Sequence, residues 1–245
     1  MGQTHSGVAA VLHDLVAQAK DSIEPPVHLL DTISFLAQPT ELPDLLLSLA
    51  KDDQAISACA ARSFHHPLGF TKLTLIDALP AYMLRVHVWW PDRKAGVDHI
   101  HNHRFNFVSS IVCGGYDMPI YEQARRGLPM IEYQEEVSID LGWRLRCRGR
   151  ARLKELTTLR LRAGCAYAFS REALHRTTVL PSSPCVSLFL QTAMSKSTTK
   201  VFVDQADPTP IMVRKEPLTS EYYRSQLEAV LVLLSTGQSD MALRP

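Results

Sequence analysis

The spacing of apolar residues changes along the chain, from a helical period in the first quarter to a two-residue period after about position 69. Between Ser6 and Asp21 the apolar residues recur every three or four positions, which predicts an amphipathic helix with Ser6 as its N-cap. Three shorter helical patterns follow, at 27–36, 41–49 and 52–64. We therefore expect a helical layer over residues 1–66 that packs on the rest of the chain, unless it forms a contact between two copies.

Beyond position 69, β-branched and aromatic residues alternate with polar ones, as in strands whose two faces differ. The predicted strands cover 71–76, 82–90, 105–112, 116–121, 131–139, 143–150, 156–161, 167–169, 176–180, 186–191 and 200–203. Many short strands separated by turns are typical of β-sandwiches and barrels. The sequence therefore predicts a mainly β domain over residues 67–204.

The last part of the chain, residues 205–245, predicts an extended segment followed by a helix. Prolines interrupt the residues up to Pro217, and from Ser220 to Leu234 the apolar residues again recur at helical spacing. Gly237 follows this pattern, and because glycine commonly ends helices, we expect the C-terminal helix to stop there.

Three histidines in the middle of the chain stand two residues apart, at His99, His101 and His103. On a strand these side chains would point to the same face. Imidazole is the commonest protein ligand for zinc, iron, copper and nickel, so this spacing indicates a metal site. A catalytic ion needs a further ligand from elsewhere in the chain, and His175 is our candidate.

Two stretches resemble the two motifs of the cupin superfamily. His101 and His103, followed by Gly114 or Gly115, are similar to the first motif, in which a glycine follows two metal-binding histidines. The stretch from Gly164 to His175 is similar to the second motif, which ends on the last ligand. The resemblance implies a cupin barrel, a double-stranded β-helix of jelly-roll type, whose catalytic metal is held by His101, His103 and His175.

A narrower resemblance points to the thiol dioxygenases, the group of cysteine dioxygenase. It rests on Cys165–Tyr167, Leu174–Arg176 and Val186–Leu188, and on Phe70–Lys72, which is similar to an aromatic-Thr-Arg segment that binds the substrate carboxylate in that group. The resemblance implies iron(II) held by three histidines without a carboxylate. It also places Lys72, as an anchor for an anionic substrate group, and Tyr167 in the substrate pocket.

The chain departs from that group at the residues that move protons. The Ser-x-His-x-Tyr relay of the thiol dioxygenases corresponds here to Ser187, Phe189 and Gln191. Phe189 and Gln191 would form a pocket wall that transfers protons less well than the relay. Lys72 replaces an arginine, and an ammonium holds a carboxylate with looser geometry than a guanidinium does. The resemblance therefore implies a relative with an altered substrate.

Three other polar residues near the motifs are candidates for the site or for its surroundings. His99 is either a fourth ligand or acid–base group, or a half-solvated residue at the entrance of the ligand strand, and we favour the second. His87, which by alternation shares a face with Arg85 and Trp89, either donates a hydrogen bond to a metal ligand or faces solvent. Arg104 alternates away from the ligands and is expected outside the barrel.

A run of basic residues from Arg144 to Lys154 alternates with other residues and predicts a basic ridge on one face of a strand. An acidic partner or a phosphorylated substrate would fit such a ridge. We favour the simpler interpretation, a solvated face that is balanced by Glu132, Glu135, Glu136 and Asp140 on a neighbouring strand.

Composition and charge narrow the class of protein. Of 245 residues, 46% are hydrophobic and 21% are charged, which suits one globular domain with a sizeable core. Lys and Arg number 26 against 25 Asp and Glu, so no nucleic-acid or membrane partner is expected. The five scattered cysteines and the absence of a secretory signal or a long apolar run predict reduced thiols and a cytoplasmic protein.

The leading functional hypothesis is a mononuclear non-haem iron(II) oxygenase or dioxygenase. It would act with O2 on a small, carboxylate-bearing substrate, either amino-acid-like or a thiol. Zinc, copper and nickel stay open as the metal. The alternatives are a redox-silent cupin lyase, isomerase or decarboxylase, and a non-catalytic cupin that binds a ligand. Monomer and homodimer are both compatible with the sequence.

Overall fold

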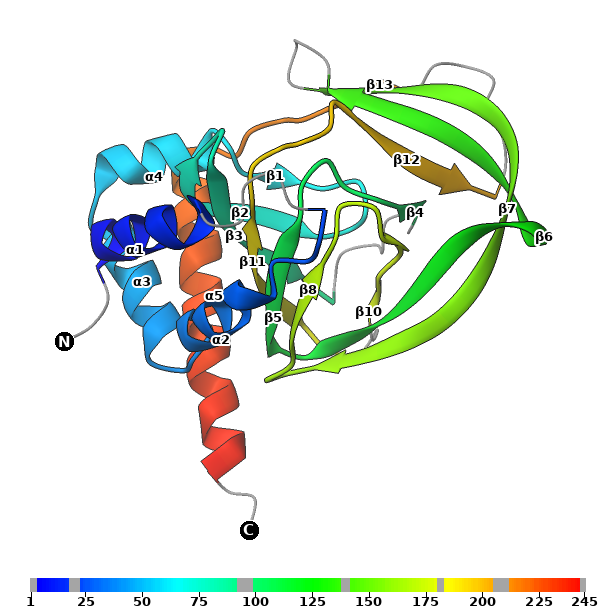
Figure 1. The fold of residues 1–245 in the computed structure, drawn as a ribbon. Helices are drawn as coiled ribbons and strands as arrows, with labels where there is room; N and C mark the ends of the chain where they lie inside the picture. The colour runs from blue at the N-terminus through cyan, green and yellow to red at the C-terminus, as the bar shows by residue number, and fades with distance from the viewer. Residues whose placement is uncertain are drawn as a thin grey trace.

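The computed structural model describes residues 4–17, 23–91, 99–137, 142–179, 183–204 and 212–242. Two antiparallel β-sheets face each other, and helices from both ends of the chain gather on the outer side of one sheet (Figure 1). The predicted class, a mainly β fold of barrel type with an N-terminal helical layer and a C-terminal helix, is confirmed.

The first quarter of the chain is helical, as predicted. Its elements are α1 (His5–Ala17), the 3-10 turn η1 (Val27–Leu29), α2 (Leu30–Leu36), α3 (Glu41–Ala50) and α4 (Asp53–Ala60). The side chain of Asp52 caps α4 by accepting a hydrogen bond from the backbone N of Ala55, at 2.9 Å. Helix α4 ends earlier than the apolar pattern suggested, because Phe64 already pairs with Lys72 in the first sheet.

The first sheet has the strand order β1-β2-β3-β11-β5-β8. These strands are β1 (Phe64–His65), β2 (Thr71–Ala78), β3 (Tyr82–Trp89), β11 (Cys185–Gln191), β5 (Phe107–Cys113) and β8 (Ala166–Phe169). Strands β3 and β11 are buried on both faces. Their outward residues, such as Val86 and Leu188, join the helices in one apolar core, so their inward residues are left to line the interior.

The second sheet has the strand order β12-β4-β9-β6-β7-β13, with β10 paired to β6. These strands are β12 (Thr198–Val203), β4 (Ile100–His101), β9 (Leu174–His175), β6 (Gly115–Val137), β7 (Gly142–Arg162), β13 (Met212–Arg214) and β10 (Thr178–Val179). The strands predicted at 116–121 and 131–139 form the single long strand β6, and those predicted at 143–150 and 156–161 form β7. The pairing of β6 with β7 continues across an irregularity between Gln123 and Leu128. The predicted strand positions 138–139 and 180 lie outside the described residues.

The expected strand through all three central histidines is wrong. Only Ile100 and His101 are in β4, and the chain from Asn102 to Asn106 is irregular. The alternation argument therefore does not explain why His101 and His103 meet, and the polar contacts described below do.

The C-terminal helix α5 (Ser220–Ala242) runs past Gly237, so the expected stop at this glycine is also wrong. A helical glycine costs only about 1 kcal/mol relative to alanine, which a helix anchored elsewhere tolerates. The anchor lies in its first turns, where the Tyr223 hydroxyl donates to the backbone oxygen of Thr74 in β2, at 2.6 Å. Within the described residues, no helix is long and apolar enough to cross a membrane.

Candidate metal centre and its cavity

His101, His103 and His175 converge in the space between the two sheets. Strands β4 and β9 pair with His101 opposite His175, and β9 is held in turn against Ile120 of the long strand β6. His103 follows His101 by two residues on the irregular segment. One ring nitrogen from each histidine lies within 4.8 Å of the others, and the Nε2 atoms of His103 and His175 are 3.4 Å apart.

Backbone carbonyls orient two of these rings. Nδ1 of His101 lies 2.9 Å from the oxygen of His99, and Nδ1 of His175 lies 3.0 Å from the oxygen of Ala173. A carbonyl only accepts, so each Nδ1 carries the proton and donates it. The Nε2 atoms of both neutral rings then keep a free lone pair, which is how second-shell hydrogen bonds prepare histidine ligands.

The electrostatics of the cluster favour neutral rings. Burial lowers the pKa of His175 to about 3, and the neighbouring His101 adds to this effect. Burial likewise lowers the pKa values of His101 and His103. All three rings are therefore neutral near pH 7, and the neutral imidazole is the form that binds metal ions.

The donor set fits a resident metal ion. Two imidazole nitrogens that each bind one ion at about 2.1 Å are roughly 3.0–3.4 Å apart. The observed separation of 3.4 Å between two Nε2 atoms meets this condition.

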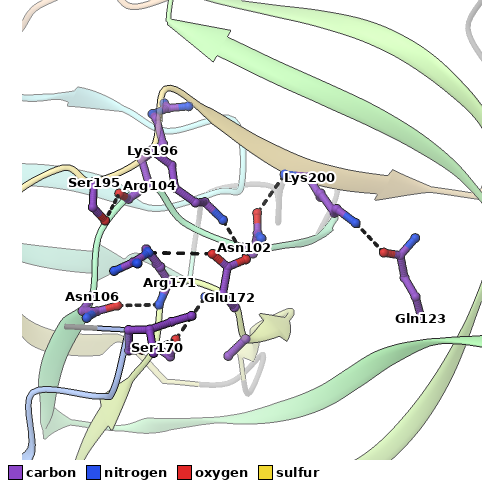
Figure 2. A network of polar contacts seen from close by, with 12 residues as sticks. Asn102, Arg104, Asn106, Gln123, Ser170, Arg171, Glu172, Ser195, Lys196 and Lys200 are labelled. Atoms are coloured by element: carbon purple, nitrogen blue, oxygen red, sulfur yellow. Dashed lines mark hydrogen bonds and ion pairs between the residues drawn. The ribbon is translucent and has the colours of Figure 1, made fainter. Parts of the chain in front are cut away.

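Two buried asparagines shape the irregular segment that carries His103 (Figure 2). The side-chain oxygen of Asn102 accepts from the backbone N of Lys200 at 2.7 Å, and Oδ1 of Asn106 accepts from the backbone N of Arg171 at 2.8 Å. Nδ2 of Asn106 donates to the oxygen of Glu24 at 3.0 Å. These contacts tie the segment to strand β12, to the loop before β9 and to the N-terminal layer.

The backbone of His103 and the surrounding side chains complete this frame. The N–H of His103 donates to the oxygen of Arg171 at 3.2 Å. Glu172 forms ion pairs with Lys196 at 2.9 Å and with Arg171 at 3.7 Å (Figure 2). Because the frame joins residues up to 98 positions apart, the position of His103 depends on the tertiary structure.

The histidines border a cavity of about 400 Å³ between the two sheets. The volume suits a small molecule. Its walls are rich in aromatic rings, among which Phe107 stacks on Phe189 at 4.4 Å and packs against His103 at 4.9 Å between ring centroids. Such walls make the surroundings of the histidines largely apolar.

Lys72, Tyr167, Phe189 and Gln191, the substrate residues expected from the sequence, all line this cavity. Nζ of Lys72 lies 5.0 Å from the centroid of the Phe64 ring. Gln191 and Phe189 face inward from β11, and the Tyr167 hydroxyl lies 2.6 Å from that of Tyr116.

His99 and His87 also line the cavity, but they do not belong to the cluster of three histidines. His99 is half-buried and contributes its backbone oxygen to His101. His87 is buried, so the solvent-facing reading is wrong, and its ring packs against Phe70 at 4.3 Å and Phe189 at 4.8 Å between centroids.

Arg104 is buried at the cavity wall, which corrects the expectation that it lies outside the barrel. Its Nη1 donates to Glu135 at 3.0 Å, and alternation failed here because Arg104 is not in a strand.

Sequence reasoning did not assign a role to four further residues of the cavity wall: His66, Arg85, Tyr116 and Lys215. Alternation along β3 places Arg85 on the same face as His87, so its position was readable. No local pattern signals His66 or Lys215, which reach the cavity through the fold.

On the exposed side of the second sheet, the basic ridge of β7 is balanced in part by acids of β6. Arg146 pairs with Glu136 at 3.7 Å, and Lys154 pairs with Glu122 at 3.6 Å. The expectation that Glu135 balances the ridge is wrong, because it pairs with Arg104 at the cavity wall, and Asp140 lies outside the described residues.

No family model matches the chain, and no curated protein matches its sequence. Among solved structures, DMSP lyase DddQ from Ruegeria pomeroyi DSS-3 is 13% identical over 53% of this chain and 50% of its own, with a TM-score of 0.31. A chain from the crystal structures of two DMSP lyases is 17% identical over 51% of this chain and 47% of its own, with a TM-score of 0.30. A cupin-like protein from Thermotoga maritima is 13% identical over 64% of this chain and 83% of its own, with a TM-score of 0.28.

The chain thus spans about half the length of the two lyase structures that it matches. Likenesses with TM-scores near 0.3 carry no argument about its activity or ligands.

Proposed function

We propose that this protein is a metal-dependent enzyme of cupin type that acts on a small anionic molecule. The observation that carries the proposal is the convergence of three neutral imidazoles, from His101, His103 and His175, at the wall of a cavity of about 400 Å³. Two of their Nδ1 atoms are already engaged by carbonyls, so the donor atoms are oriented before any ion binds.

Iron(II) is the metal we favour, and an O2-dependent oxidation is the reaction. A bound iron(II) would supply the electrons that O2 chemistry needs, and three protein ligands leave coordination positions for other molecules. The part of the protein is to hold the donor nitrogens, keep the cavity dry and orient the substrate. Lys72 is placed to hold an anionic group of that substrate, because its ammonium has no carboxylate partner among the described residues.

The test is reconstitution under anaerobic conditions. Metal-stripped protein is loaded with iron(II), oxygen is admitted, and oxygen uptake is measured over amino acids, thiols and related acids. We expect stoichiometric iron binding and substrate-dependent oxygen uptake in the wild type, with both lost in His175→Ala. His13→Ala is the matched control, since His13 lies exposed on α1.

A redox-silent enzyme, such as a lyase, isomerase or decarboxylase, is the second candidate. The favouring observation is the Tyr116–Tyr167 hydroxyl pair at the cavity wall, which offers a proton donor where the histidine and tyrosine of the thiol dioxygenase relay are replaced by Phe189 and Gln191. Burial raises the pKa of Tyr167 to about 12, so the pair keeps its protons at neutral pH. Turnover of an acid with zinc and without oxygen would favour this candidate over the first.

Absence of metal binding would overturn both enzyme hypotheses. If metal analysis finds no bound ion, and the result is the same for wild type and His101→Ala, the remaining function is ligand binding without catalysis.

A further inference from the structure

The cavity carries more positive charge than its own acids balance. Five cationic residues line it, whereas Glu135 is the only acid among the described lining residues. Two of the cations are paired, because Arg104 contacts Glu135 at 3.0 Å and Arg62 contacts Asp77 at 2.6 Å. Lys72, Arg85 and Lys215 have no carboxylate at ion-pair distance within the described part of the chain.

Arg85 is the most deeply placed of the three. It is 8% exposed, and its guanidinium stacks on Phe189 with its central carbon 4.3 Å from the ring centroid. Nη1 donates to Oε1 of Gln191 at 2.8 Å, whereas the buried Nε has no hydrogen-bond partner among the described residues. A buried N–H without an acceptor is costly, so the hydrogen-bonding capacity of Arg85 is only partly satisfied within the described residues.

Lys72 lies beside Arg85 on the next strand. In the β2–β3 register Lys72 is opposite His87 and Thr74 is opposite Arg85, so the two cations are diagonal neighbours on the inward face. Lys72 is 8% exposed, and the one described partner of its Nζ is the ring of Phe64 at 5.0 Å. Burial, and then Arg85 and Lys215, lower the pKa of Lys72 well below its ordinary value, as expected for an ammonium without a counter-ion.

Lys215 completes the group from the segment between β13 and α5. Its Nζ lies 4.2 Å from the ring centroid of Trp143 and 5.6 Å from that of Phe64, the same ring that Lys72 contacts. The neighbouring strands β2 and β3 and the distant segment before α5 therefore bring their cations to one wall.

This arrangement is unfavourable without a counter-anion. Buried charges are normally paired, and unpaired like charges in a site of low dielectric repel each other. A ligand with two negative charges would supply the missing partners. One negative charge would leave most of the repulsion uncompensated.

We propose that Arg85, Lys72 and Lys215 form a receptor for a dianionic ligand, and that the substrate of the proposed enzyme is a small diacid or phosphate monoester. The proposal rests on the proposed function in assigning this ligand as the substrate, but the receptor itself needs no metal. The guanidinium of Arg85 and the ring of His103 both contact Phe105, at 5.4 and 5.1 Å, so the receptor and the histidines are within reach of one small molecule.

The experiment uses the full-length protein, stripped of metal with a chelator, at low ionic strength. Succinate and glycerol phosphate are the dianionic probes, and butyrate is the singly charged control of similar size. Binding is measured by calorimetry and by the rise in melting temperature. We expect the dianions to bind and raise the melting temperature, with butyrate at least tenfold weaker. The better of the two dianions then assigns the substrate class.

Two variants test the residues. Arg85→Met and Lys72→Met are each expected to weaken dianion binding at least tenfold, while Arg146→Met, on the exposed face of β7, leaves it unchanged. Ligand-free Lys72→Met is also expected to melt at a higher temperature than the wild type, a result that a merely structural lysine would not give. Equal binding of succinate and butyrate, or unchanged dianion binding in both variants, would overturn the proposal.

Metal content is measured separately on the same preparations. Dianion binding with no metal binding would support the receptor and reject the metal enzyme. Metal binding without a response to the dianions would reject the receptor and leave the metal enzyme standing.

Discussion

The Nε2 atoms of His103 and His175 lie 3.4 Å apart although 72 residues separate them in the sequence. This distance suits two nitrogens that bind one ion, so removing either ring should weaken the binding of that ion. We predict that His103→Ala and His175→Ala each reduce the affinity for divalent metal at least 100-fold. Titration with cobalt(II), followed by its visible absorption, measures this loss.

His99→Ala is the control for these variants, because it tests whether His99 is also a metal ligand. His99 contributes its backbone oxygen to His101, and alanine keeps that oxygen. Metal affinity should therefore change less than threefold. A loss as large as that of His175→Ala would instead make His99 a ligand.

The Asn106 side chain holds the segment after His103 by accepting from Arg171 N and donating to Glu24 O. Asn106→Ala removes both hydrogen bonds, and a typical hydrogen bond contributes about 0.5–1.5 kcal/mol to stability. We predict a loss of about 1–3 kcal/mol in the free energy of unfolding, measured with urea, and a weaker metal site. Gln38→Ala, which removes an exposed amide contact on the surface, should change stability by less than about 0.5 kcal/mol.

The alternation of side chains along strands explains which residues of the cavity wall could be predicted from the sequence. Side chains on β3 switch faces at each residue, so Arg85 and His87 could be assigned to one face from the local pattern, whereas Phe189 and Gln191 were assigned to the pocket by the resemblance to the thiol dioxygenases. The structure places all four at the cavity. The resemblance to cupin motifs added His175, which no local pattern connects to His101.

Contacts between distant segments explain what was missed. His103 lies on an irregular segment whose shape depends on Asn102 and Asn106. Arg104 turns inward because Glu135 on β6 is there to receive it. Lys215 reaches the cavity through the pairing of β13 with β7, and no periodicity within 205–219 signals it.

Helix α5 belongs to the same apolar core as the inner strands. Leu227 is 1% exposed and joins Tyr223 in the cluster that covers the outer face of the first sheet. Leu227→Ala should lower the free energy of unfolding by about 2–5 kcal/mol, the usual range for a buried leucine. Val232, 63% exposed on the same helix, is the control, and Val232→Ala should cost less than about 0.5 kcal/mol.

The Tyr116–Tyr167 pair gives a spectroscopic prediction. Burial raises the pKa values of both hydroxyls, that of Tyr167 to about 12, so both should ionise only above the pH range in which exposed tyrosines titrate. Tyr167→Phe removes one partner of the 2.6 Å contact and should destabilise the protein by about 1 kcal/mol. Ultraviolet difference titration of the wild type should show that neither Tyr116 nor Tyr167 ionises near pH 10.

We predict that the contribution of Lys215 to the free energy of unfolding changes with pH. Burial lowers its pKa from 10.5 to about 8 in the folded protein, so between these pH values the unfolded chain binds more protons at this site than the folded one. Stability rises with pH wherever the unfolded state holds more protons. The contribution of Lys215 should therefore increase from pH 8 to pH 10.5, by up to about 2 kcal/mol after allowance for its partial exposure.

The comparison with Lys215→Met isolates this term, because every other titrating group is common to both proteins. Urea unfolding at pH 7.5 and pH 10 should show the wild type gaining stability relative to the variant. An unchanged difference between the two pH values would mean that the ammonium of Lys215 is solvated as in the unfolded chain. Bound succinate should flatten the same difference, since a counter-anion restores the ordinary pKa of the lysine and with it the equal proton binding of the two states.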